Sequence, residues 1–189
     1  MDRKFLDKIV STIGLLLAVV LLAAGGLLTW GYDFANNQVK SQLASQQISF
    51  PAAGTAGLTS LPQPDQSIVA KYAGDQLLTG RQAEVFADHY IAVHLKEIGG
   101  GKTYSQESAA AQANPSDTAL AGTVATLFKG ETLRGMLLNA YAFWQLGQIA
   151  MYSALVSFLG GILFLLLALL GFVHARRIGA SWRERIIEE

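Results

Sequence analysis

The stretch Ile13-Gly-Leu-Leu-Leu-Ala-Val-Val-Leu-Leu-Ala-Ala-Gly-Gly-Leu-Leu28 lies inside a longer run, from Ile9 to Tyr32, that contains no charged residue. About 20 apolar residues are enough for a helix to cross the ~30 Å hydrocarbon layer of a bilayer. A second charge-free stretch extends from Gly135 to Val173, and its most apolar part begins at Ile149. The two runs therefore predict two transmembrane helices, at residues 9–32 and residues 149–173.

This interpretation has two alternatives. A globular core that hides two such helices would need far more chain than 189 residues. The first run has a second alternative, a cleaved signal peptide, because Lys4 and Lys8 precede it and Ala23-Ala24-Gly25 offers small residues for cleavage. Its apolar stretch is longer than the roughly 7–15 residues typical of a signal peptide, so we favour an uncleaved anchor and leave cleavage of residues 9–32 open.

The basic residues near the two runs predict an orientation, because short cytoplasmic flanks carry an excess of Lys and Arg. Residues 1–8 contain Arg3, Lys4 and Lys8, and residues 174–189 contain Arg176, Arg177, Arg183 and Arg185. Both termini are therefore expected in the cytoplasm, with residues 33–148 outside it. In the tail, Ile178, Trp182 and Ile186 recur every four residues, which suits either an amphipathic helix on lipid headgroups or a frayed terminal helix.

The central residues 33–148 predict helices joined by short turns, and no segment alternates apolar and polar residues as a strand would. Residues 33–50 are expected to continue the first span as a polar stalk, and residues 51–64 to form a linker without its own core. Further helices are expected over residues 66–78, 80–98, 104–114 and 115–128, and from residue 132 into the second span.

Capping signals define several of these helix ends. Thr79 with Gln82, and Thr103 with Gln106, have the spacing of capping boxes, which begin helices. The triplet Gly99-Gly100-Gly101 is expected to end one helix, and Pro115 to lie in the first turn of another. The predicted fold class is thus an all-α membrane protein, with two transmembrane helices flanking an extracytoplasmic helical bundle.

Composition and motifs exclude several function classes. Lys+Arg and Asp+Glu balance at 14 each, which argues against a nucleic-acid partner, and the chain has no cysteine for a disulfide framework. The segment Gly99-Gly-Gly-Lys-Thr103 resembles the end of a phosphate-binding loop, but Lys96 stands where the motif needs glycine, so no nucleotide site is predicted. We identify no catalytic set, no metal site and no cofactor, and lean towards a protein that is not an enzyme.

One candidate ligand site remains. On a helical wheel of residues 80–98, His94 and Glu97 share the apolar side of the helix, and Tyr90 lies one turn before His94. A histidine beside a carboxylate in partly buried surroundings is able to bind a ligand or to titrate near neutral pH. The alternative is a structural hydrogen-bonding group, with His89 solvated at the edge of the charged face.

Small residues mark a candidate packing face on each span. They form rows at helical spacing, which let helix backbones approach closely, although such residues are common in membrane helices in any case. The rows are Ser11, Gly14, Ala18 and Gly25 on the first span, and Ser153, Ser157 and Gly161 on the second.

Three segments, residues 80–95, 99–105 and 130–142, carry a resemblance. Through them the chain resembles a group of uncharacterised actinobacterial membrane proteins with two transmembrane helices, over roughly residues 70–175. Some members carry a ring-opening dioxygenase label, but this chain lacks a recognisable iron-binding set. The resemblance implies a bacterial cytoplasmic membrane and transfers no functional residue.

The sequence therefore predicts a membrane-anchored, non-enzymatic accessory or scaffold protein. Its expected partners are the lipid bilayer and either further copies of itself or another envelope protein. The alternative is an extracytoplasmic ligand-binding or sensing module that acts through a partner.

Overall fold

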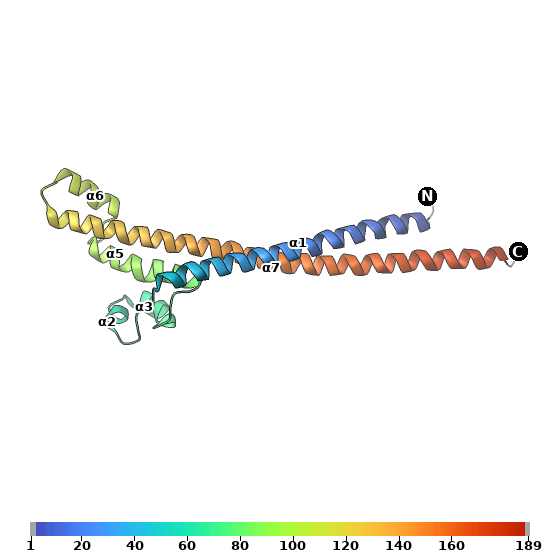
Figure 1. Ribbon diagram of the computed structural model, residues 1–189, viewed down its shortest axis with the longest axis horizontal. Helices are drawn as coiled ribbons and strands as arrows, with labels where there is room; N and C mark the ends of the chain where they lie inside the picture. The colour runs from blue at the N-terminus through green and yellow to red at the C-terminus, as the bar shows by residue number, and fades with distance from the viewer. Residues whose placement is uncertain (1–2, 188–189) are drawn as a thin grey trace. The chain divides into compact units, whose positions relative to one another are not determined.

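The computed structural model describes the backbone of residues 3–187 and the side chains of residues 4–177. Helices make up 84% of the chain, and the described residues contain only an isolated β-bridge, between Ser49 and Gln76. The prediction of an all-helical chain is confirmed. Two compact units are formed (Figure 1): the terminal unit, of residues 1–33 and 148–189, and the central unit, of residues 34–147.

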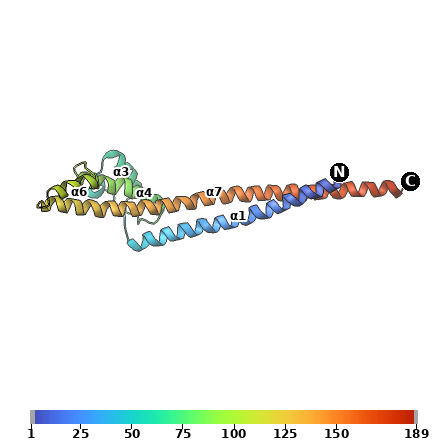
Figure 2. The same ribbon diagram turned by 90° about the horizontal axis from the view of Figure 1, so that it is seen from above.

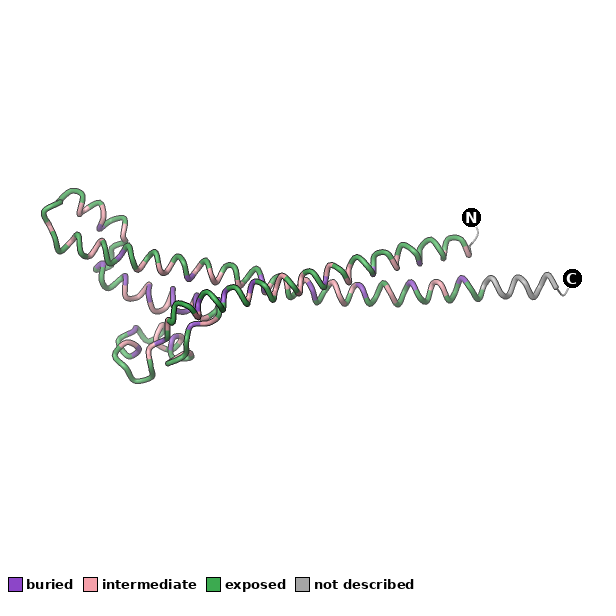
Figure 3. Tube along the Cα trace, in the orientation of Figure 1, coloured by how far each residue is buried: buried purple, intermediate pink, exposed green. Residues whose placement is uncertain are grey.

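The terminal unit is built from the first part of α1 (Arg3–Gln46) and the last part of α7 (Thr118–Ile187). Both helices are long and apolar enough to cross a membrane. Their buried positions recur every seven residues, at Ser11, Ala18 and Gly25 on α1 and at Ala154, Gly161, Ala168 and Ala175 on α7 (Figure 3). We call these seven residues the small-residue seam, because every one of them is glycine, alanine or serine.

The seam is where the two helices of the terminal unit touch. A Cβ built on Gly14 would lie 3.6 Å from Cβ of Ala168, and one on Gly161 would lie 3.3 Å from the backbone oxygen of Ala18. A repeat of seven is the spacing that keeps one face of a helix turned towards its partner through a left-handed supercoil. The large aliphatic side chains of both helices are left on the outside, where many are more than half exposed.

The central unit packs short helices against the first part of α7 (Figure 2), and Val39 and Leu43 of α1 belong to the same core. In chain order the short helices are α2 (Ala56–Thr59), α3 (Gln63–Val69), the 3₁₀ turn η1 (Ala70–Tyr72), α4 (Gly80–Val85), the π-helical turn η2 (Phe86–Ile91), α5 (Ala92–Ile98) and α6 (Tyr104–Ala113). Their shared core includes Leu43, Val69, Leu77, Ala87, Leu127 and Leu137, none of which is more than 1% exposed.

The capping signals are confirmed. Thr79 and Gln82 form a reciprocal capping box at the start of α4, and Thr103 and Gln106 form another at the start of α6. Gly100 and Gly101 have φ values of +56° and +86°, as expected for the turn after α5. Each of these helix ends is decided by residues a few positions apart along the chain, and local sequence therefore predicts them.

The expected helix over residues 66–78 is wrong. α3 begins earlier, at Gln63, and the helical path ends at Tyr72, after which Gly74 has a φ of +80°. The residues that follow pair instead with the chain after α1: the amide of Leu77 donates to Ile48 O at 2.8 Å, and that of Phe50 to Asp75 O at 2.9 Å. This pairing buries Phe50 and Leu77 in the core, which the short helix would not do.

Two further expectations differ from the structure. Pro115 does not start a helix: Asp117 caps the first turn of α7 by accepting from the amide of Leu120 at 2.9 Å. The segment 51–64 is not a plain linker, since it contains α2 and buries Leu58 and Leu61 in the core.

Candidate functional site

The helix over residues 80–98 is interrupted by a π-helical turn, η2, between two α-helical segments. Such a turn acts as an inserted residue and shifts the face that follows it. Ala87 and Ile91 are buried within the turn, and after it Leu95 is buried whereas Ile98 is 45% exposed. π turns of this kind often accompany functional sites, so the residues of η2 are the natural place to look for one.

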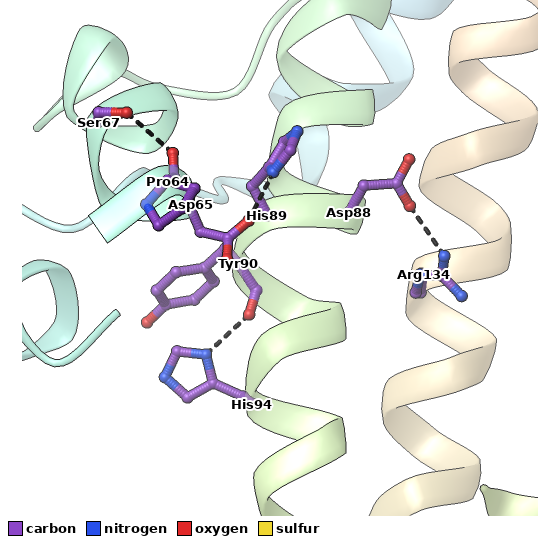
Figure 4. Close-up of polar contacts among 8 residues, drawn as sticks. All are labelled: Pro64, Asp65, Ser67, Asp88, His89, Tyr90, His94 and Arg134. Carbon is purple, nitrogen blue, oxygen red and sulfur yellow. Dashed lines mark hydrogen bonds and ion pairs between the residues drawn. The ribbon is translucent and has the colours of Figure 1, made fainter. Parts of the chain in front are cut away.

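His89 of η2 forms a hydrogen bond with Asp65 of α3 (Figure 4). Its Nδ1 lies 2.8 Å from Oδ1 of Asp65, and the two side chains are 29% and 25% exposed. The expectation that His89 is simply solvated is therefore wrong. The helical wheel missed this contact because Asp65 lies 24 residues earlier, on a helix whose bounds were also misplaced.

The preceding residue, Asp88, pairs in another direction, with α7. Arg134 Nη2 donates to Asp88 Oδ1 at 2.8 Å, and Arg134 Nη1 lies 3.5 Å from Oε2 of Glu131. The hydrogen bond with Asp88 is the main cause that raises the pKa of Arg134, and partial burial opposes it. Arg134 is thus held in its charged form, as a fixed cation opposite η2.

The candidate ligand residues are only partly brought together. The rings of Tyr90 and His94 lie 4.5 Å apart between centroids, and His94 Nδ1 donates to the backbone oxygen of Tyr90 at 2.7 Å (Figure 4). Because that oxygen only accepts, the bond assigns the proton to Nδ1 and leaves Nε2 of the neutral ring as an acceptor. Glu97 is exposed and lines a separate depression of about 480 Å³ with Val93 and Gly100, which neither ring lines.

Aromatic rings lie in a row between Phe50 and His94. Phe86 contacts Phe50 edge-on, with centroids 5.2 Å apart, and Tyr90 on its other side at 4.8 Å. Tyr90 and His94 therefore continue the hydrophobic core outwards. The arrangement places the two rings as packing groups at the edge of the core, with one imidazole nitrogen available.

The predicted packing residues of the spans lie as follows. Ser11, Ala18, Gly25 and Gly161 are buried, whereas Gly14, Ser153 and Ser157 are half-buried. On α7 the buried positions are those of the small-residue seam, which passes through Ala154 rather than through the two serines. The spacing of seven between small residues is the sequence signal that would have found it.

The polar groups around η2 do not form a metal centre. Among the residues whose side chains are described, no three or more His, Asp or Glu groups lie close enough to hold a metal ion. What the cluster does chemically is to join α3, η2 and α7, through the His89–Asp65 hydrogen bond and the Asp88–Arg134 ion pair. The repeated hydrophobic tail residues Ile178, Trp182 and Ile186 fall outside the described side chains.

Comparisons with family models, with curated proteins and with solved structures find nothing that matches this chain.

Proposed function

We propose that this chain is a membrane-anchored, non-enzymatic scaffold or accessory protein of the bacterial envelope. Its two apolar helices anchor it in the cytoplasmic membrane, both termini lie in the cytoplasm, and the central unit is an extracytoplasmic interaction domain. Two helices of sufficient length and apolar character support the anchor, and the basic flanks support the orientation. The resemblance to two-span actinobacterial membrane proteins supports the same location.

One observation carries the scaffold role: the polar side chains Asp88 and His89 of η2 are engaged with other parts of the central unit. His89 pairs with Asp65 of α3, and Asp88 pairs with Arg134 of α7. These contacts hold α3, η2 and α7 to one another. We therefore interpret the central unit as a domain whose helices are held together by these contacts and which acts by binding another molecule at its surface.

Purification of the full chain in several mild detergents tests the proposal. We expect a stable oligomer or a defined envelope partner to remain bound after size-exclusion chromatography. A lone monomer in every detergent would contradict the scaffold role. Orientation is tested separately with a reporter fused after Gly100, which we expect to be active outside the cytoplasm; activity of a cytoplasmic reporter at that point would contradict the topology.

A second function is favoured by the Tyr90–His94 pair alone. An imidazole with a fixed Nδ1 proton and an available Nε2 is the arrangement used to accept a hydrogen bond from a ligand. A sensing module of this kind would act through a partner. If this function holds, His94→Ala changes how the melting temperature depends on pH or on a ligand. An unchanged dependence would dismiss it.

A further inference from the structure

A groove runs between α1 and α7 within the central unit. It has a volume of about 410 Å³, and its walls come from residues 34–46 of α1 and 136–143 of α7. Gln38, Gln42 and Gln46 lie along the α1 wall at intervals of four residues, and Asn139 faces them from α7. The rest of the lining is apolar, and three of its large side chains are well exposed: Phe34 at 50%, Met136 at 59% and Phe143 at 42%.

The chemistry of this lining separates it from the other surfaces of the central unit. None of the eleven residues that line the groove is charged. By contrast, η2 carries Asp88 and His89, which are held by the contacts described above. A primary amide holds two N–H donors and a carbonyl acceptor, so one glutamine side chain is complementary to another.

We propose that this groove binds the same groove of a second copy of the chain, forming a two-fold symmetric dimer. In such an interface the same surface faces itself, so a lining of one charge sign would repel its own copy, whereas an amide and apolar lining is self-complementary. This inference rests on the proposed membrane anchor. Two copies inserted in the same direction present the groove at the same height, because it begins at Phe34, next to the predicted span 9–32.

The absence of cysteine from the sequence makes the proposal directly testable by cross-linking. Gln42→Cys and Asn139→Cys place one thiol on each wall of the groove, and both positions are exposed. Lys40→Cys is the matched control, because Lys40 is exposed on the same helix but does not line the groove. Membranes from cells expressing each full-length variant, and the two groove variants together, are treated with an oxidant and run on a non-reducing gel.

We expect a covalent dimer of the chain at the groove positions, several times more abundant than at Lys40. Equal or lower cross-linking at the groove would overturn the proposal. Cross-linking of the groove to a different protein would overturn it as well, and would assign the groove to that partner. If the purified chain is oligomeric while the groove thiols stay unlinked, the dimer surface is wrong and the scaffold role stands; a monomer without partner refutes both.

A charge variant provides a second readout. Gln42→Glu puts a carboxylate at the proposed interface of each copy, so this dimer should dissociate at a higher protein concentration than the dimer of the unmodified chain. Co-expression of Gln42→Glu with Gln42→Lys should restore it. A dimer that is indifferent to both substitutions would contradict the placement of Gln42 at the interface.

Discussion

Substitution by alanine should stabilise the protein at two glycines in the first part of α7, Gly122 and Gly135, but not at a third, Gly130. A Cβ built on Gly122 or Gly135 meets nothing within 4 Å. At Gly130 the added Cβ would overlap Cδ2 of Leu95 and lie 3.1 Å from its Cγ. Leu95 is 6% exposed and belongs to the core, so it has little space into which to move.

Two opposing effects, helix propensity and overpacking, decide whether each substitution raises or lowers the free energy of unfolding. Alanine is favoured over glycine in a helix interior by about 1 kcal/mol, so Gly122→Ala and Gly135→Ala should raise the free energy of unfolding by about that amount. Overpacking a filled core costs about 1–3 kcal/mol, so at Gly130 the propensity gain is cancelled or exceeded. Gly130→Ala should therefore be neutral or destabilising by up to about 2 kcal/mol.

The assay is urea-induced unfolding of the full-length protein in one mild detergent, followed by brief proteolysis of the unfolded fraction. A double-mutant cycle isolates the cause: in a Leu95→Ala background the space is open, so Gly130→Ala should stabilise by about 1 kcal/mol. If Gly130→Ala stabilises the unmodified chain as much as Gly135→Ala does, the close approach of α5 to α7 is refuted.

Three other changes test separate contacts. Asp88→Asn and Arg134→Gln should show a coupling energy of about 0.5–1 kcal/mol in urea unfolding, because the pair is about one-third exposed. Because the pKa of Arg134 is raised, the stabilisation that its charge provides is fully present at pH values below the ordinary pKa of arginine. It is lost only as the pH rises through the raised pKa, so the Arg134 charge should add no pH dependence to the free energy of unfolding between about pH 6 and 9. Gly14→Cys with Ala168→Cys should form an intramolecular disulfide, seen on a gel after proteolysis, because their Cβ positions lie 3.6 Å apart. Leu137→Ala, at a position that is 0% exposed, should cost about 2.5–5 kcal/mol in the same unfolding assay.

The cysteine pair at Gly14 and Ala168 and the Leu137→Ala substitution each have a matched control. Gly26→Cys with Ala168→Cys should not form a disulfide, because a Cβ on Gly26 meets nothing within 4 Å. An equal yield from both pairs would contradict the close contact at Gly14. Met136→Ala, one residue from Leu137 but 59% exposed, should cost well under half as much, and equal costs would contradict the core position of Leu137.

The parts of the fold that sequence predicted well are those decided by near neighbours. Thr79 and Thr103 cap their helices through residues three positions later, and Gly100 adopts the left-handed backbone that ends α5. The extended pair of residues 48–50 and 75–77 escaped prediction because its partners lie far apart in sequence. Neither segment alternates long enough to indicate a strand, so only the burial of Phe50 and Leu77 against the core explains it.

The candidate site was half predicted for a similar reason. Tyr90 and His94 were singled out by spacing on one helix, and their contact lies within that helix. The π turn, which includes Tyr90 and precedes both His94 and Glu97, contains no glycine or proline that would indicate it. Its polar residues Asp88 and His89 are held by partners on two other helices, which no helical wheel includes. Tertiary pairing, rather than local propensity, therefore sets the register of this helix.

The terminal unit shows what decides packing between two apolar helices. Ser153, Ser157 and Gly161 were predicted as the row because all three are small, yet the buried row on α7 passes through Ala154 and Gly161 and leaves the two serines half-buried. In lipid, aliphatic side chains gain nothing by leaving their surroundings, so helices associate through the close approach of backbones, and side-chain size matters more than polarity. The same reasoning explains the outer surface, where Val156 is 70% and Leu170 66% exposed. A helix pair that buries its smallest residues and exposes its largest apolar ones is stable in hydrocarbon and a liability in water, which favours the membrane for this unit.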